Sequence, residues 1–196
     1  MAWNTERTKL LLLAAATSEF SEKGLAGARV DHIARSAGVS KERIYRYFGN
    51  KAGLFYAVLG ELVSRDLEVP LQERGSESLS DFVGQLFDRY CEDDTLARLL
   101  LWEALEGTPG ALESNCTGRW WIRQMDRLLI AIPGLDRAGA ADVLFTIVTL
   151  CACSPVILHG SSYPSGERIM RDSARRASVV RPVALTVQSL LGTSTS

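Results

Sequence analysis

The residues best suited to chemistry lie between Lys41 and Phe48, where cations and aromatic rings share one short predicted helix. Helical spacing turns Ile44 and Phe48 inward, because they are four positions apart. The side chains left mostly outward are those of Lys41, Arg43, Tyr45 and Arg46. Such a face suits double-stranded DNA, whose phosphates attract cations and whose base edges are readable in the major groove. Arginine in the first turn matches the two acceptors of guanine.

A preceding helix must hold this face in place. Its predicted apolar side consists of Val30, Ile33, Ala34 and Ala37. Gly38 allows a sharp corner, Val39 plugs that corner, and Ser40 is a good N-cap for the helix that follows. The stretch from Arg29 to Lys51 therefore predicts a helix-turn-helix. An ordinary helical corner with a solvated basic face remains the alternative.

Charge is distributed unevenly along the 196 residues. Residues 1–55 hold nine lysines and arginines against five acids, although the whole chain has a net charge of −1. A basic head on an acidic body is typical of a protein that binds a polyanion through its head. The composition, with only 6 prolines and 46% hydrophobic residues, predicts an all-α chain with one or two small domains.

Other chemistries find little support in the sequence. The chain has no nucleophile–base set, no glycine-rich phosphate loop and only two histidines, so we expect neither an enzyme nor a metal or other cofactor site. The four cysteines show no CxxC spacing and are expected to be buried thiols. A redox or soft-metal sensor that uses Cys151 and Cys153 is the alternative.

The N-terminal run Leu10–Ala16 is similar to a minimal secretory signal. Its helical phase continues through Phe20, however, and cleavage would remove most of a helix that the helix-turn-helix needs. No run approaches the roughly 18 apolar residues of a membrane span, the longest candidate being Val143 to Cys153. We therefore expect a cytoplasmic protein that does not bind membranes.

Residues 5 to 59 resemble the N-terminal domain of the TetR family of bacterial transcriptional repressors. The matching elements include Val30-Asp31-His32-Ile33-Ala34, Gly38-Val39-Ser40, Ile44-Tyr45-Arg46-Tyr47-Phe48 and Lys51. The resemblance implies a three-helix DNA-binding head over residues 1–50 and a helical ligand-binding and dimerisation body over 51–196. A connector helix at about 51–65 would join them and act as a lever.

The same resemblance implies roles for single residues. Tyr45 corresponds to a position that reads bases, and Tyr47 to one that touches the DNA backbone. Arg29 and Lys51 would bind phosphate, Lys51 with help from a helix N-terminus, and Ser40 would cap its helix and contact phosphate. Core packing for Tyr47 and plain solvation for Arg46 remain alternatives. Small hydroxyl residues are common in the family where this chain has Arg29 and Arg43, so base specificity does not carry over.

In the body, spacing and breakers predict helices over 79–91, 95–106, 111–132 and 137–159, with Pro155 kinking or ending the last. One or two further helices fall within 167–191, the last opened by Pro182. The predicted loops cover 68–80, 107–110 and 160–166. By their place in the chain, the 137–159 helix and the 167–191 region resemble the helices through which the family forms homodimers.

The resemblance also implies a pocket for a small apolar or aromatic ligand. The candidates to line it are Phe82, Phe87, Trp102, Trp121, Met125 and Phe145, each of which could instead be plain core. The expected function is a repressor that binds a palindromic operator as a homodimer and leaves it when a ligand binds. An activator of the same fold and a helical protein-interaction module without DNA binding are the alternatives.

Overall fold

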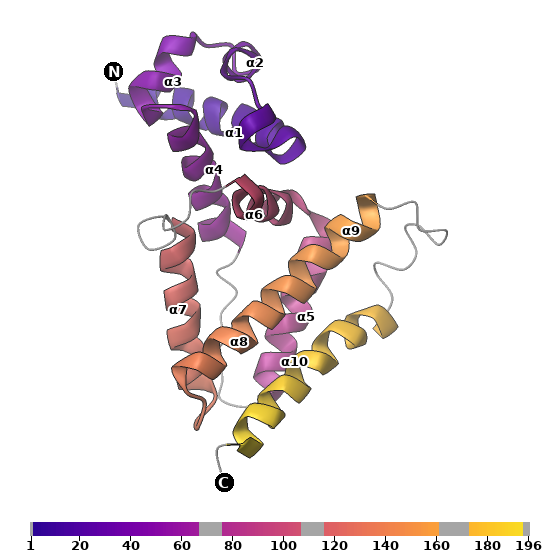
Figure 1. Ribbon diagram of the computed structural model, residues 1–196. Helices are drawn as coiled ribbons and strands as arrows, with labels where there is room; N and C mark the ends of the chain where they lie inside the picture. The colour runs from indigo at the N-terminus through magenta and orange to yellow at the C-terminus, as the bar shows by residue number, and fades with distance from the viewer. Residues whose placement is uncertain (1, 67–75, 107–115, 161–172, 194–196) are drawn as a thin grey trace.

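The structure, a computed structural model, describes residues 2–66, 76–106, 116–160 and 173–193. Every regular element in these ranges is a helix, which confirms the all-α prediction. Figure 1 shows a small helical head at one end of the molecule and a larger helical body at the other. The predicted loop at 107–110, most of the one at 160–166 and residues 167–172 lie outside the described ranges.

The head consists of α1 (Ala2–Gly27), α2 (Val30–Ser36) and α3 (Lys41–Phe48). The inner side of α1 carries Leu12, Ala16 and Phe20 at four-residue spacing, and all three are fully buried. The regular helix ends at Gly24, where φ is 69° and ψ is −177°, and one further turn reaches Gly27. This bend turns the end of α1 toward the start of α2.

Helix α4 (Lys51–Asp66) leaves the head and enters the body, within one residue of the predicted connector. The side chain of Asn50 accepts a hydrogen bond of 2.7 Å from the backbone N–H of Gly53 and so caps the start of α4. On the head side, Phe55 meets Phe20 edge to face, with ring centroids 5.2 Å apart. The opposite end of α4 buries Leu62 and Val63 in the body core.

The body begins with α5 (Ser76–Glu92), α6 (Thr95–Glu106) and α7 (Cys116–Ala131). Helix α6 has the predicted bounds, and the carboxylate of Asp93 accepts from the backbone N–H of Thr95 at 3.0 Å. The prediction of a loop as far as Ser80 is wrong, because α5 already begins at Ser76; residues 68–75 lie outside the described part. Residues 111–115 of the predicted 111–132 helix also lie outside it.

Helix α8 (Arg137–Val148) starts where predicted, with the Asp136 side chain accepting from the N–H of Gly139 at 2.7 Å. It continues without a break through a wide π turn, η2 (Thr149–Cys153), into α9 (Ser154–Gly160). Pro155 therefore does not stop the helix. A proline ring clashes with the carbonyl four positions earlier in a regular α-helix, and a π turn immediately before it relaxes that contact.

Helix α10 (Ser173–Thr193) packs against α5 and α8. The prediction that Pro182 opens a helix is wrong, because Pro182 lies inside α10. An internal proline costs about 3 kcal/mol or more in helix stability. Burial of Val179, Val183 and Val187 on either side of it offsets that cost, since these residues form one apolar stripe at four-residue spacing.

Among the described residues, one helical run, Arg137–Ile157, is long and apolar enough to cross a membrane by length and composition, with mean hydropathy 2.0. The prediction that no run reaches that length is therefore wrong. The core helix of a soluble protein passes the same test, but only 39% of this window is buried within the chain. Helices α8 and α9 thus leave an apolar side uncovered by their own chain.

Candidate functional site

The corner between α2 and α3 is built as its residue types predict. Gly38 adopts a φ of 66°, and the backbone N–H of Val39 donates to the carbonyl of Ala34 at 3.0 Å. Ile33 and Ile44 are fully buried between the two helices and hold them at a fixed angle. The opposite side of α3 faces away from the head and is free of this packing.

Lys41 stands in the first turn of α3 and forms an ion pair with Asp31 of α2. Its ammonium lies 2.8 Å from the Asp31 carboxylate, and both side chains are largely exposed. The hydrogen bond and the opposite charge raise the pKa of Lys41 and lower that of Asp31. This pair ties the start of α3 to α2, so Lys41 is directed along the surface of the head.

Ser40 occupies the N-cap position of α3 with an extended backbone, but its side chain makes no capping bond. The prediction that the Ser40 hydroxyl caps the helix is therefore wrong. The carboxylate of Glu42 accepts from its own backbone N–H and from the Ser40 hydroxyl, and both bonds lower its pKa. Glu42 lies in the first turn of α3, where its negative charge complements the helix dipole.

Arg43 is positioned by a residue from the far side of the head. Its guanidinium donates to the hydroxyl of Thr8 on α1 at 3.2 Å, and Thr8 is buried. The sequence reasoning missed this contact. The sequence indicates only that Thr8 is buried, because it precedes Leu12 by four residues and so lies in line with the buried stripe of α1. The contact fixes the direction in which Arg43 leaves α3.

The two tyrosines of α3 differ in their surroundings. Tyr45 is 46% exposed on the outer side, next to the exposed Arg46. Tyr47 is half-buried; its ring meets Phe48 edge to face and lies 6.0 Å from the ammonium of Lys9. Tyr45 and Arg46 are thus free to contact another molecule, whereas Tyr47 both packs against the head and keeps an exposed portion.

Lys51 begins α4 and is bound to the end of α1. Its ammonium donates to the backbone carbonyls of Ala26 and Ala28, both at 3.1 Å. Cations at the C-terminal end of a helix stabilise its unpaired carbonyls. The N–H of Ala26 in turn donates to the carboxylate of Glu106 on α6 at 2.7 Å. One peptide segment therefore connects α4, α1 and α6.

A buried carboxylate that the sequence reasoning missed organises the other side of this junction. Glu19 on α1 is only 4% exposed and accepts from the ammonium of Lys23 and from the backbone N–H of Arg29. The oxygen Oε2, which accepts from Lys23, also lies 2.7 Å from Nδ1 of His32. Burial alone would raise the pKa of Glu19, but these bonds outweigh it and lower the pKa. The four-residue spacing from Glu19 to Lys23 was the available signal.

The side chain of Arg29 is exposed at the N-terminus of α2. The backbone N–H of Arg29 donates to Glu19, and this hydrogen bond positions Arg29 at the start of α2. The head carries cationic and aromatic side chains on or beside the α2–α3 unit, and each is at least partly exposed. These are Arg29, Lys41, Arg43, Tyr45, Arg46 and Tyr47, with Lys51 at the junction behind them.

Five of the six proposed pocket residues belong to one hydrophobic cluster or pack against it, and Phe145 does not. Phe82 and Phe87 are buried on α5, while Trp121 and Met125 are half-buried on α7. Phe145 is 65% exposed, so the prediction that it lines an interior pocket of the chain is wrong. It lies on the side of α8 that faces away from the core.

Trp102 has a different contact from the one predicted. Its indole N–H donates to the carbonyl of Ser21 on α1 at 3.3 Å. A Cβ atom at Gly24 would lie only 2.7 Å from its ring. Trp102 therefore packs α6 of the body onto the bend of α1, and with Glu106 it connects α6 to the head.

In the described part of the chain, no three His, Cys, Asp or Glu side chains are grouped so that they could hold a metal ion. Burial raises the pKa of both Cys151 and Cys153. The Cys151 thiol lies 3.7 Å from the carbonyl of Val83 in the core. Thiols that hold their proton are poor nucleophiles and poor metal ligands, which favours the structural interpretation.

Three comparisons connect this geometry to known proteins. Residues 12–58 match the family model described as bacterial regulatory proteins, tetR family. The HTH-type transcriptional repressor SCO4008 of Streptomyces coelicolor is 37% identical over 191 residues, covering 90% of this chain and 95% of that protein. The HTH-type transcriptional repressor NicS of Pseudomonas putida is 28% identical over 109 residues, covering 53% of this chain and 51% of NicS.

Two solved structures match the whole architecture. The regulator SCO4942 of Streptomyces coelicolor superposes with a TM-score of 0.65 at 30% identity, covering 90% of this chain and 96% of that one. The fatty acid degradation regulator FadR of Bacillus halodurans superposes with a TM-score of 0.66 at 23% identity, covering 93% and 97%. The family consists of DNA-binding regulators that work as dimers, not of enzymes. Because the match to SCO4008 spans nearly all of both chains, this protein belongs to the TetR family of bacterial transcriptional regulators.

Proposed function

We propose that this protein is a cytoplasmic repressor that binds a palindromic operator as a homodimer and is released by a small, mainly apolar ligand. The observation that carries the proposal is the outer face of α3, where Tyr45 and Arg46 are exposed while Arg43 is held in place by a buried hydroxyl. Full-length similarity to a protein named a repressor supports the direction of regulation.

The contacts of the head support distinct roles on DNA. Arg43 is already held by Thr8, so less side-chain freedom is lost when it meets a guanine or a phosphate. Tyr45 and Arg46 reach base edges or thymine methyls on the same face. Lys41 and Arg29 lie at the edges of that face, where the DNA backbone passes, and Ser40 and Tyr47 add polar contacts to phosphate.

Lys51 can serve both the fold and DNA. An ammonium group has three donors, and two of them reach the carbonyls of Ala26 and Ala28. The third is available to a phosphate at the start of α4, where the helix dipole also favours an anion. The position from which Lys51 meets a phosphate therefore depends on the end of α1.

The dimer would form through the uncovered apolar side of α8, α9 and α10. Phe145 on α8, Ile157 on α9 and Leu185 on α10 are all more than half exposed. Regulators of this family work as dimers, and a second copy of the chain would remove these side chains from water. Two heads then bind two half-sites about one helical turn of DNA apart or a multiple of it.

Ligand release would pass through α6 as well as through the α4 lever. Trp102 and Glu106 contact the bend of α1 at Ser21 and Ala26. The carbonyl of Ala26 holds Lys51, so a shift of α6 moves the residue that bonds a phosphate. The two heads then lose the spacing that the operator requires.

The test is selection of binding sites from a random duplex pool with the full-length protein. We expect an enriched inverted repeat and an affinity that falls steeply with salt, because phosphate contacts release counterions. Placed across a promoter, the selected site should lower transcription in the presence of the protein. A rise in transcription would indicate an activator, and absence of both enrichment and salt dependence would indicate an interaction module without DNA binding.

A further inference from the structure

The indole of Trp120 on α7 carries a polar group that its own protein leaves unused. Trp120 is 2% exposed, and its N–H has no hydrogen-bond partner in the described part of the chain. A buried donor without a partner destabilises the fold, and such groups are uncommon in native structures. The neighbouring Trp121 meets Trp120 edge to face at 5.5 Å and is only half-buried.

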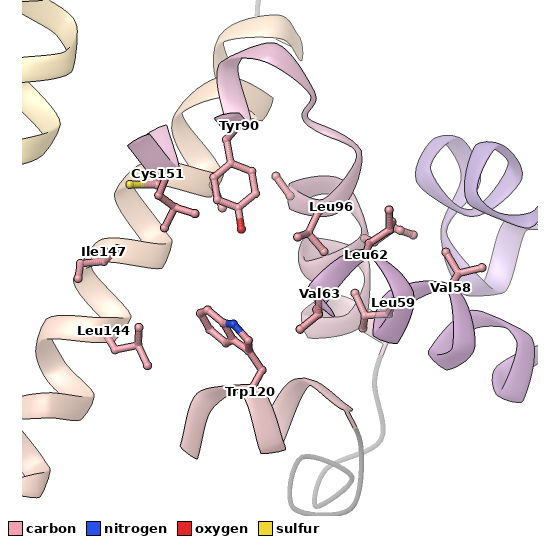
Figure 2. Packing of buried hydrophobic residues seen from close by; sticks show 14 of the residues in the cluster. Val58, Leu59, Leu62, Val63, Tyr90, Leu96, Trp120, Leu144, Ile147 and Cys151 are labelled. Atoms are coloured by element: carbon pink, nitrogen blue, oxygen red, sulfur yellow. The ribbon is translucent and has the colours of Figure 1, made fainter. Parts of the chain in front are cut away.

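Figure 2 shows that the Trp120 indole points into the interior of the body, toward side chains of other helices. Val63 of α4 and Leu96 of α6 lie on one side of it, and Leu144 and Ile147 of α8 lie on the other. The Tyr90 ring of α5 points back toward the indole from the opposite end. All of these residues are nearly or fully buried.

Charge is absent from this interior as far as the structure describes it. Besides the polar atoms of Trp120 and Tyr90, the buried polar and charged side chains in the described ranges are Thr8 and Glu19, which belong to the head, and Gln124 on α7. A charged ligand would need a buried counter-charge, which costs free energy to desolvate. A neutral molecule needs none.

We propose that this interior binds a neutral, largely apolar molecule whose one hydrogen-bond acceptor, such as a carbonyl oxygen, bonds to Nε1–H of Trp120. The proposal rests on the proposed function and names the ligand chemistry for it. Tryptophan donates and does not accept, so the ligand must supply the acceptor. Trp120, which is not among the six predicted lining residues, is thus the residue that selects the ligand.

The test uses aromatic ketones and hydrocarbons of the same skeleton as probes: acetophenone with ethylbenzene, 1-indanone with indane, and benzophenone with diphenylmethane. Binding to the full-length protein is measured by calorimetry. We expect at least one ketone to bind about tenfold more tightly than its hydrocarbon, the ratio typical of one net hydrogen bond. W120F, which keeps a ring and removes the N–H, should abolish that ratio. W121F is the matched control and should keep it.

A second measurement does not depend on either variant. In wild-type protein labelled with ¹⁵N-tryptophan, the bound ketone should shift the Trp120 indole N–H resonance downfield, and the hydrocarbon should not. Failure of every ketone to bind, or a ketone preference that survives in W120F, would overturn the proposal. If W120F fails to fold, the wild-type protein still decides: a ketone that binds without shifting the Trp120 indole resonance would overturn the proposal.

Operator release is measured separately with the same probes. Release that persists in W120F would leave the repressor function intact and remove Trp120 as the site of ligand selection. Ketone binding that needs Trp120 but does not change operator affinity would keep this site and remove ligand-controlled release. The two proposals therefore fail in different ways.

Discussion

Replacing Gly24 by alanine adds one methyl group at the point where the head meets the body. Its backbone, with φ of 69° and ψ of −177°, is in a region that only glycine adopts readily. The new Cβ would lie 2.7 Å from the ring of Trp102 and 2.7 Å from a carboxylate oxygen of Glu106. Both the backbone and the packing around it therefore oppose the change.

The two effects can be given rough sizes. Forcing a side chain into this backbone region costs about 1–3 kcal/mol, and overpacking a close contact costs about another 1–3 kcal/mol. The expected loss in the free energy of unfolding is thus about 2–6 kcal/mol. Against a typical total of 5–15 kcal/mol, this is large enough to measure without ambiguity. Each kcal/mol lost from the free energy of unfolding lowers the Tm of a chain of this length by about 2–4 °C.

The assay is urea denaturation at one fixed protein concentration, because dimerisation makes apparent stability depend on concentration. Gly27→Ala is the matched control, since Gly27 is on the same helix and an added Cβ there makes only an ordinary contact at 3.4 Å with Lys23. We expect that control to be neutral or slightly stabilising, as alanine favours helix. In the double variant with Trp102→Ala, the packing cost due to the indole should be recovered, and the backbone cost should remain.

Two results would refute this reasoning. One is a Gly24→Ala protein as stable as the Gly27→Ala control, which would mean that the bend does not need glycine. The other is a loss that Trp102→Ala leaves entirely unchanged, which would mean that the body does not press on the bend.

Three further predictions concern charge, DNA and assembly. The fold lowers the pKa of Glu19, so its carboxylate stabilises the protein above the ordinary pKa of about 4.3, and this stability is lost as the pH falls through the pKa of the folded state. In Glu19→Gln the free energy of unfolding should depend less on pH in that window. An unchanged pH profile would contradict this prediction. Tyr45→Ala should relax sequence preference in site selection, whereas Lys51→Ala should weaken all duplexes alike; the reverse pattern would overturn both roles. Phe145→Glu should give monomers by sedimentation, while Leu105→Glu, at another exposed apolar position, should remain dimeric.

The local parts of the fold were predictable because their determinants are close in sequence. Helix α3 has the predicted bounds, since Gly38 and the spacing of Ile44 act within a few residues. Residue types alone also placed Tyr45 and Arg46 on the outside. The interpretation of Pro182 failed because packing of α10 on two other helices outweighs a local preference.

The contacts that position the candidate site could not be derived from the sequence. Thr8 is 35 positions from Arg43, and Ala26 is 80 positions from Glu106, so nothing in the spacing connects them. Which side of α8 and α7 is buried also depends on neighbouring helices. For this reason Phe145 proved to be exposed and Trp120, rather than Trp121, proved to be the buried indole.

The wide turn at Thr149–Cys153 determines which surfaces the long α8–α9 helix shows to a neighbour. Residues twelve positions apart, such as Phe145 and Ile157, would diverge by about 120° in an unbroken α-helix at 100° per residue. A π turn absorbs one residue, so they behave as if eleven apart and diverge by only about 20°. A homologue with one residue fewer at this point and a plain helix would show the same surface. Chain length can therefore vary here by one residue without changing how two protomers meet.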